Sequence, residues 1–552
     1  MASSVNNNES VGLLSGQPSQ DGARRRRVWT VLGLGLLFAG ICSIVVVFTL
    51  RSSQYKHNSN KDDSGRLPVH DVNLLLITDT HSWVNGHQHT PDITADYSDL
   101  LSLHEHLRDY VRDTKQQAYL FLNNGDLNDG TGLSGYIKPS TTHILPIVRH
   151  MPFDAINCGN HELYDNASIA DLVDSGFIKS WNGAYLTANI MLGPNQTLGH
   201  PYKRVQLADV GKPDATGHLL IFGFLYNMQG TAPAVTVELV QNVVKSSWFI
   251  NAIKGSMADD LAAIIVLAHM HYVDPLVTVL RDAIRNISAT DRLPIIFLTG
   301  HSHLRRFQQL DDFAISLEAG KYMDTIGYVS FDIPKATDLV LNFVNYTITP
   351  NRTTFARMAG LKDTKTFDTK NGTALREQIT KVYAQLGLSR VVGCSNATYS
   401  YLADVSQNNS LAALYIDQVA PNTVMQHVPN ISTAKPFLIH SAGTLRYDLF
   451  QGNITVNDLA TLSPFADNYH YTLQAYSGQV LNEAIDVSAE LVYPWPLDKQ
   501  TDYHVMTLSF DWPGINATLF KANLNPTWGI VPNYNSTSVF IDYFDNNPAW
   551  AC

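Results

Sequence analysis

Side chains that can bind metal ions follow five short apolar runs of the sequence, at 72–77, 119–122, 153–156, 261–268 and 293–298. Runs of this length are typical of buried β-strands. The residues that follow offer carboxylate, amide and imidazole ligands: Asp79, His81, Asp126, Asn160, His269, His301 and His303. A set without thiolates suits Zn, Mn or Fe better than a closed structural zinc site. Because open α/β sheets build their sites at the carboxyl ends of strands, we expect these side chains to converge.

The stretch Gly159-Asn160-His161-Glu162 combines two of these functions in adjacent residues. Asn160 offers a neutral oxygen ligand, and His161 can donate a proton near neutral pH. Alone, the stretch fits an ordinary turn with a capping side chain equally well. The four other pieces, which precede and follow it after strand-like runs, favour its interpretation as part of a site.

The series Asp-x-His, Gly-Asp-x-x-Asp, Gly-Asn-His-Glu, His and Gly-His-x-His resembles the calcineurin-like metallophosphoesterases. The resemblance implies an α/β domain over residues 69–350, a β-sandwich flanked by helices, with a site for two divalent metal ions. It implies that one ion is bound by Asp79, His81 and His303, that the other is bound by Asn160, His269 and His301, and that Asp126 bridges them. Such a pair lowers the pKa of a water molecule and neutralises phosphoryl oxygens, which implies hydrolysis of phosphoesters.

We predict that His161 handles the proton or the charge of the transition state. The sequence leaves two carboxylate partners open. By resemblance, 5′-nucleotidases place a carboxylate four residues after the metal-binding Asn, where this chain has Tyr164 followed by Asp165. Protein Ser/Thr phosphatases instead use the second Asp of Gly-Asp-x-x-Asp, which here is Asp129. Our hypothesis is an Asp129–His161 pair. We also expect Asn124 to donate a hydrogen bond to the phosphate.

Residues 391–552 carry a second set of motifs. Ser-Ala-Gly-Thr-Leu-Arg ending at Arg446, Gly-Asn-Ile-Thr from 452, and Leu-Ser-Pro-Phe ending at Phe465 are similar to the C-terminal domain of the 5′-nucleotidases. The resemblance implies a second α/β domain in which Arg446 contacts a nucleotide and Phe465 stacks on its base. A surface arginine in an ion pair and a core phenylalanine are the alternatives.

The chain departs from the family pattern in two ways. Ser441 stands where Asn usually opens the arginine motif. A glycine-rich motif that supplies a second aromatic ring is not found; Trp528 and Tyr534 lie in the corresponding part of the chain without aligning. Recognition of the base is therefore less well supported than the hydrolytic centre.

An uncharged, mostly apolar run at 28–50 is long enough to span a bilayer as a single helix. Four arginines at 24–27 precede it, so the positive-inside rule favours a cytosolic tail at 1–27 and a polar stalk at 51–68 on the other side. A cleaved signal peptide is the alternative. N-glycosylation sequons favour a lumenal or extracellular body, and all follow the run: Asn166, Asn195, Asn286, Asn345, Asn351, Asn371, Asn396, Asn408, Asn430, Asn453, Asn516 and Asn535.

In the tail, Glu9 and the pair Leu13-Leu14 resemble an acidic dileucine signal that sorting adaptors read for delivery to lysosomes or vacuoles. Together with the predicted span, this motif predicts a single-pass membrane protein of the fungal, vacuolar type. Its catalytic body would lie in the lumen. The cell surface and secretion are the alternatives.

Composition limits the remaining possibilities. A chain of 552 residues with 45% hydrophobic and 16% charged residues predicts two folded domains, joined here by a linker at 351–390 that contains a helix. A net charge of −11 argues against nucleic acid as a partner. Cys158 is expected to be a small buried residue, and a Cys394–Cys552 disulfide is a hypothesis.

The function that fits these observations best is a two-metal nucleotidase that releases phosphate from nucleoside monophosphates in a vacuolar lumen. A nucleotide-sugar or phosphodiester hydrolase and a protein phosphatase could use the same centre. The second domain argues against a protein substrate, because it is expected to cover the metal cleft. A binding module on a catalytically dead phosphatase fold is the alternative of a different class, and the complete ligand set argues against it.

Overall fold

The computed structural model describes residues 65–135, 137–194, 196–428, 433–485 and 490–552. The predicted tail, the predicted span at 28–50 and most of the predicted stalk lie outside these ranges. Among the described residues, no helix is both long and apolar enough to cross a bilayer. The unit Arg66–Cys552 holds both sets of motifs.

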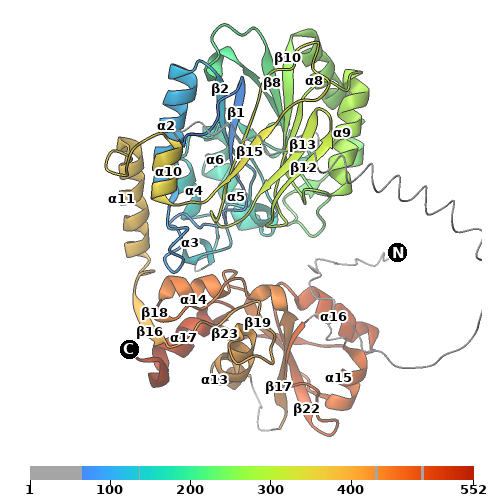
Figure 1. Ribbon diagram of the computed structural model, residues 1–552. Helices are drawn as coiled ribbons and strands as arrows, with labels where there is room; N and C mark the ends of the chain where they lie inside the picture. Colours follow the sequence, from blue (N-terminus) through green and yellow to red (C-terminus); the bar gives the residue numbers. More distant parts are fainter. Residues whose placement is uncertain (1–64, 136, 195, 429–432, 486–489) are drawn as a thin grey trace, which may run out of the picture. The chain divides into compact units, whose positions relative to one another are not determined.

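The first part of this unit is a sandwich of two six-stranded sheets (Figure 1). One sheet has the order β15 (Val344–Ile348), β14 (Ile326–Phe331), β1 (Val72–Ile77), β2 (Ala118–Asn123), β3 (Ala155–Asn157) and β4 (Tyr185–Leu186). The other has the order β12 (Arg305–Asp311), β13 (Ala314–Ala319), β11 (Ile295–Thr299), β10 (Leu261–His269), β8 (His218–Leu225) and β7 (Tyr202–Gln206). The predicted β-sandwich is thus present.

Alternation along the strands explains why two layers form. Val72, Leu74 and Leu76 of β1 belong to the core between the sheets, which they share with apolar residues of the second sheet. Leu75 and Ile77 point the other way, into a core shared with helix α2 (Tyr97–Arg108). Because both faces are covered, β1 is apolar except at Asn73.

Helices cover the outer faces of the sandwich. Helix α9 (Pro275–Ser288) begins with Asp274, whose carboxylate accepts a hydrogen bond from the backbone N–H of Leu276. Helix α8 (Ser247–Ala258) begins with Ser246, whose hydroxyl accepts one from Phe249. Such N-caps satisfy backbone donors that the helix leaves unpaired, so these residues fix where each helix starts.

The parallel strands set the place of the site. In the first sheet, β1 pairs in parallel with β2, and β2 with β3. In the second, β10 pairs in parallel with β8 and β11. The carboxyl ends of neighbouring parallel strands lie at one edge of a sheet, and the loops that carry the predicted ligands leave these ends.

The last part of the unit is the predicted second α/β domain. Its main sheet has the order β21 (Glu490–Tyr493), β17 (Lys435–Ser441), β22 (Asp502–Leu508), β19 (Asn468–Thr472) and β23 (Trp528–Asn535). A two-stranded sheet pairs β16 (Val391–Ser395) with β18 (Gly452–Thr455). Helix α11 (Lys370–Gln385) precedes it, close to the predicted linker helix, and packs along α2.

The cysteines are arranged as the sequence suggested. Cys394 of β16 and Cys552 form a disulfide, which joins two positions 158 residues apart. Cys158 is a free, buried thiol directly after β3. The disulfide therefore links two positions of the C-terminal domain, whereas the Cys158 thiol belongs to the core of the first domain.

Candidate metal centre and substrate site

The loops after the parallel strands bring six carboxylate and imidazole side chains together in two groups. One group is Asp79, His81, Asp126 and His303; the other is Asp126, His269 and His301. Within each group the possible ligand atoms all lie within 4.8 Å of one another. Asp126 belongs to both groups, which is the position that a residue bridging two ions must take.

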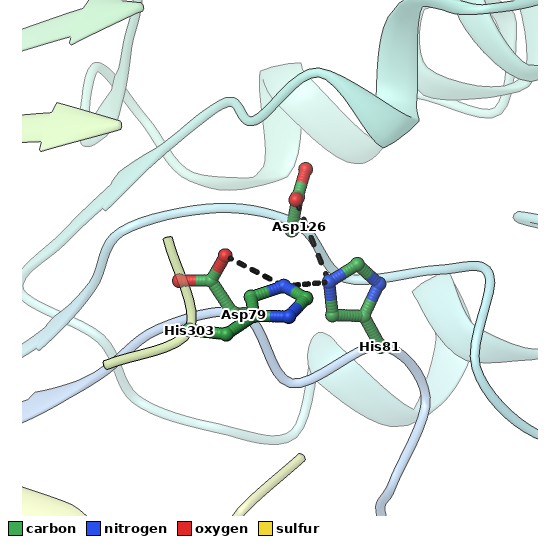
Figure 2. A group of neighbouring side chains, drawn as sticks. All are labelled: Asp79, His81, Asp126 and His303. Carbon is green, nitrogen blue, oxygen red and sulfur yellow. Dashed lines mark hydrogen bonds and ion pairs between the residues drawn. The ribbon is translucent and has the colours of Figure 1, made fainter. Parts of the chain in front are cut away.

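Figure 2 shows the first group. Nε2 of His303 lies 3.5 Å from Oδ1 of Asp79 and 3.1 Å from Nε2 of His81. Nε2 of His81 in turn lies 3.5 Å from Oδ2 of Asp126. Imidazole nitrogens and carboxylate oxygens thus point at one common space, an arrangement suited to a divalent cation.

In the second group, the ring of His269 faces the carboxylate of Asp126. Nε2 of His269 lies 3.2 Å from Oδ2 of Asp126, and 3.8 Å from Oδ1 of Asp79. Asn160, the predicted amide ligand, lies in the loop after β3. The next residue of this loop, His161, donates its backbone N–H to Oδ1 of Asp126 at 2.9 Å. This bond ties the amide-bearing loop to the shared carboxylate.

Two buried atoms test whether a metal ion fits this place. Oδ1 of Asn160 has no hydrogen-bond partner among the described residues, and Nε2 of His269 has no well-aligned hydrogen bond there, only the ion-pair contact with Asp126 at 3.2 Å. Buried polar atoms are nearly always satisfied, so these two point to a missing partner. An amide oxygen and an imidazole nitrogen both donate electron pairs to cations. The donor set therefore fits a divalent ion.

The imidazoles are also oriented as metal ligands usually are. Nδ1 of His81 contacts the carbonyl oxygen of Asn128 at 2.8 Å, and Nδ1 of His269 contacts that of Asn124 at 2.8 Å. A hydrogen bond from Nδ1 to a carbonyl fixes the tautomer that leaves Nε2 free to bind a metal.

Charge at the centre follows from burial and from the close approach of these groups. Burial lowers the pKa of His81 to about 3, and burial together with the positive charges of His269 and Arg446 lowers the pKa of His301 to about 3. Both rings are therefore neutral, the form that binds metals. For His269 the carboxylates of Asp126 and Asp79 outweigh burial and raise the pKa to about 10. A cation would replace the proton held there.

The loops adopt an unusual backbone conformation. Six of the predicted site residues have φ between 43° and 72°, a region that residues other than glycine seldom occupy: Asp79, His81, Asp126, Asp129, His301 and His303. Local hydrogen bonds hold these turns, such as those from Asp79 N–H to Gly125 O at 3.1 Å and from His81 N–H to Asp126 O at 2.9 Å. Clusters of such strained residues are typical of functional sites.

Two glycines of the motifs are required by close approach. A Cβ on Gly159 would lie 2.1 Å from Oδ1 of Asp126, and one on Gly300 would lie 2.6 Å from Oδ2 of Asp79. Both distances are far below van der Waals contact. The glycines of Gly-Asn-His-Glu and Gly-His-x-His therefore let the backbone pass directly behind the carboxylates.

Sequence reasoning left Glu162 without a role, and the structure gives it one. Its buried carboxylate accepts hydrogen bonds from the backbone N–H groups of Gly159 at 2.7 Å, of Asp126 at 3.2 Å, and of Leu127. It thus joins the loop after β2 to the loop after β3. Burial raises the pKa of Glu162 to about 7. The only signal in the sequence was its place next to His161.

The predicted partner of His161 is in contact with it. Nδ1 of His161 lies 2.9 Å from Oδ2 of Asp129. Asp165 instead caps helix α5 (Asn166–Asp174), where its carboxylate accepts the backbone N–H of Ser168 at 2.8 Å. Burial lowers the pKa of His161, but the carboxylates of Asp126 and Asp129 outweigh it and leave the pKa raised.

Asn124 makes hydrogen bonds within the frame of the site. Its side-chain amide donates to the carbonyl oxygen of Ala268 at 3.2 Å, and its Oδ1 accepts from Asn157 at 3.0 Å. The residue is fully buried. These bonds join β2 to β10 and β3, so Asn124 holds the frame of the site. Its amide nitrogen has a second proton, and the predicted hydrogen bond to a phosphate stays a prediction.

Arg446 and Phe465 of the C-terminal domain lie beside the metal-type ligands. The guanidinium carbon of Arg446 lies 5.5 Å from the centre of the Phe465 ring, and that ring lies 6.3 Å from the ring of His161 at 21°. The positive charge of Arg446 adds to burial in lowering the pKa of His303. The structure thus brings the motifs of both domains to one place.

Three aromatic residues of the C-terminal domain bear on the second ring that the sequence did not reveal, and none of them is assigned that role. The hydroxyl of Tyr534 donates to Asp542, and Trp528 donates to Asn516. Phe510 is 60% exposed, and its ring lies 6.1 Å from that of Tyr164. No motif marks Phe510, because it stands in a turn after β22 whose position depends on the fold.

Comparisons with known proteins agree with this arrangement. The family model for the NAD nucleotidase C-terminal domain matches residues 398–484. An uncharacterized protein of Schizosaccharomyces pombe is 28% identical over 434 residues, which are 72% of this chain and 69% of that protein. A secreted protein of Arthroderma benhamiae is 27% identical over 449 residues, which are 74% of this chain and 66% of that protein.

Among solved structures, the 5′-nucleotidase of Candida albicans is similar to this chain with a TM-score of 0.75. The similarity covers 87% of this chain and 99% of that one, at 21% identity. Both domains are included in this coverage, so the two-domain fold is that of the 5′-nucleotidases.

Proposed function

We propose that this chain is a metallophosphoesterase of the 5′-nucleotidase family and that it releases phosphate from small phosphoesters, nucleoside monophosphates above all. The observation that carries the proposal is the place of Phe465 beside His161 of a metal-ligand loop, with the guanidinium of Arg446 next to the Phe465 ring. A guanidinium pairs with anionic oxygens, and an exposed face of an aromatic ring stacks on a base. A nucleotide presents both groups within one small molecule.

The residues divide the chemistry among them. Two bound divalent ions would supply a nucleophilic water and neutralise charge on the phosphoryl oxygens. Asp79, His81 and His303 would hold one ion, Asn160, His269 and His301 the other, and Asp126 both. The metals are Zn, Mn or Fe by the ligand types.

His161 supplies the acid–base group of the centre, and its ring lies next to Phe465 of the C-terminal domain. Asp129 fixes its Nδ1, so Nε2 is the nitrogen that would donate to the leaving oxygen or stabilise its charge. Arg446 would bind the anionic part of the substrate and so position phosphorus in line with the leaving group. The proximity of the C-terminal residues favours a small substrate over a folded protein.

The first test measures hydrolysis by the full-length protein, purified in detergent and loaded with Mn²⁺, with the products separated by chromatography. Phosphate is the product from a monoester, UMP and glucose 1-phosphate are the products from UDP-glucose, and a nucleoside monophosphate is the product from the cyclic nucleotide. The panel is AMP, other nucleoside monophosphates, UDP-glucose, a cyclic nucleotide and a phosphopeptide, with Asp126→Asn as the blank. We expect the highest kcat/KM for nucleoside monophosphates. A preference for UDP-glucose, the cyclic nucleotide or the phosphopeptide would replace the nucleotidase by the corresponding alternative, and no release by a metal-loaded protein would favour a binding module.

We place the catalytic body in a vacuolar lumen, anchored by residues 28–50 with a cytosolic tail that carries Glu9 and Leu13-Leu14. The many sequons after residue 50 and a disulfide in the C-terminal domain support an oxidising compartment. The test is protease protection in sealed vacuolar vesicles, with glycosidase treatment. A body digested without detergent, or one without glycans, would contradict this location.

A further inference from the structure

A buried glutamate lies behind the Gly-His-Ser-His loop. Glu318 belongs to β13, which pairs in parallel with β11, the strand that leads into this loop. Its side chain is fully buried. Ser302, between the two histidines, places its Oγ 2.8 Å from Oε1 and 2.7 Å from Oε2 of Glu318. Leu304 donates its backbone N–H to Oε1 at 2.9 Å.

These contacts fit a carboxylic acid better than a carboxylate. A serine hydroxyl has a single proton and can donate it to one oxygen only. Both Oε–Oγ distances are satisfied when Ser302 donates to Oε1 and a protonated Oε2 donates back to Ser302. The pair then forms a closed, two-way hydrogen bond in the protein interior, and no buried charge remains.

The contacts of Glu318 stand on both sides of His303. Residues 301 and 303 have φ of 72° and 61°, and such strained turns persist only where neighbouring bonds determine them. Ser302 and Leu304 are the residues between and after these histidines, so the glutamate fixes the loop that aims both rings. We propose that Glu318 is a positioning residue that sets the affinity of the centre for divalent metal through the orientation of His301 and His303.

This inference rests on the metal centre of the proposed hydrolase, and Glu162 offers a contrast inside the same centre. Glu162 accepts backbone N–H groups on both of its oxygens. Glutamine at 162 would therefore turn an NH₂ group toward a donor and lose a bond. Glutamine at 318 keeps Oε1 as acceptor and can donate from its amide to Ser302. The two substitutions are alike in size and charge but opposite in expected effect.

The experiment titrates Mn²⁺ into the metal-free full-length protein in detergent, without substrate. We expect Glu318→Ala to weaken binding about 10- to 100-fold, Glu318→Gln to stay within about threefold of wild type, and Glu162→Gln to weaken binding at least about 10-fold. Glu105→Ala is the control, because Glu105 is a buried glutamate of α2 that binds Asn371 far from the loops in sequence.

Ser302→Ala removes only the hydroxyl and tests the same link if Glu318→Ala does not fold; we expect a loss of at least about threefold. Wild-type affinity in both Glu318→Ala and Ser302→Ala would overturn the inference, as would equal losses in Glu318→Ala and Glu318→Gln. Failure of the proposed function looks different: the wild type would bind Mn²⁺ and release no phosphate, while the order of the Mn²⁺ affinities would still decide the role of Glu318.

Discussion

Nδ1 of His161 lies 2.9 Å from Oδ2 of Asp129, and both side chains are buried beside the shared carboxylate of Asp126. If this pair handles the proton of the reaction, Asp129→Asn should lower kcat about 100-fold, the usual contribution of a positioned acid or base. Asp165→Asn should change kcat by less than about twofold, since Asp165 caps a helix. Steady-state kinetics at equal Mn²⁺ occupancy checks both. The reverse order of effects would transfer the role to Asp165.

The same pair predicts a shift in the pH profile. The pKa of His161 is raised, since Asp126 and Asp129 outweigh the opposing effect of burial. The ring is charged below this pKa, so an activity that needs the charged ring falls as pH rises through it. Asn at 129 removes one cause of the increase. The alkaline limb of kcat against pH should therefore move to lower pH in Asp129→Asn, and an unchanged limb would exclude His161 as the titrating group.

A second histidine makes stability depend on pH. Nε2 of His89 lies 3.0 Å from Oδ1 of Asp458, and this hydrogen bond raises the pKa of His89 above 6.5 against partial burial. The stabilisation is fully present below the unfolded pKa of about 6.5 and is lost as pH rises through the folded value. His89→Gln should destabilise by about 0.2–1 kcal/mol near pH 5.5 and by nothing near pH 9, measured by urea unfolding. Equal effects at both pH values would contradict the ion pair.

Arg446 and Phe465 should affect different parts of the substrate. Arg446→Ala removes a charge-assisted hydrogen bond and should lower kcat/KM for AMP about 10- to 100-fold. Phe465→Leu removes a stacking surface and should lower kcat/KM for AMP about 10-fold while leaving ribose 5-phosphate within about twofold. The measurement is the ratio of kcat/KM for AMP to kcat/KM for ribose 5-phosphate in each variant. Equal losses on both substrates in Phe465→Leu would mean that the ring supports the fold and does not bind the base.

The Cys394–Cys552 disulfide should stabilise the C-terminal domain. It constrains a segment of 158 residues in the unfolded chain, so Cys394→Ser should lower the free energy of unfolding by about 2–4 kcal/mol. Urea unfolding with and without a reductant gives the comparison. The reductant should remove the difference in unfolding free energy between wild type and Cys394→Ser. Cys158→Ala, which leaves the disulfide intact, should still lose stability when the reductant is added. A mass map of the oxidised protein with both thiols free would refute the bond.

Several parts of the fold and site could be predicted from sequence because they depend on local patterns. The run at 72–77 coincides with β1, since a strand covered on both faces is mostly apolar. Asp79 and Asp126 were predictable as site residues because ligands follow such strands directly. Contacts across the sheets were not. Asn124 follows β2 as the aspartates follow their strands, yet its amide meets Ala268 and Asn157, which only the assembled sheets bring near it.

The place of Phe510 and the role of Glu318 escaped prediction for the same reason. Glu318 is embedded in an apolar strand, where nothing local distinguishes a glutamate behind a site from one at the surface. Its function depends on β13 lying next to β11, and therefore on sheet order. Phe510 lies near Tyr164 through contacts between residues far apart in the chain. Residues whose role is set by a neighbour in another element become visible only in three dimensions.

The left-handed backbone at the ligands has a consequence for directed evolution. At φ of 54° in Asp126 and 72° in His301, glycine would relieve a strain of about 1–2 kcal/mol and lose the ligand. Libraries sorted only for heat resistance should therefore accumulate glycine at these positions, and the survivors should be inactive. Selection for heat resistance alone, applied to every position of the chain without any substrate, would then enrich substitutions at the catalytic centre. The centre would be recognised as the region where the more stable variants have lost their metal-binding side chains.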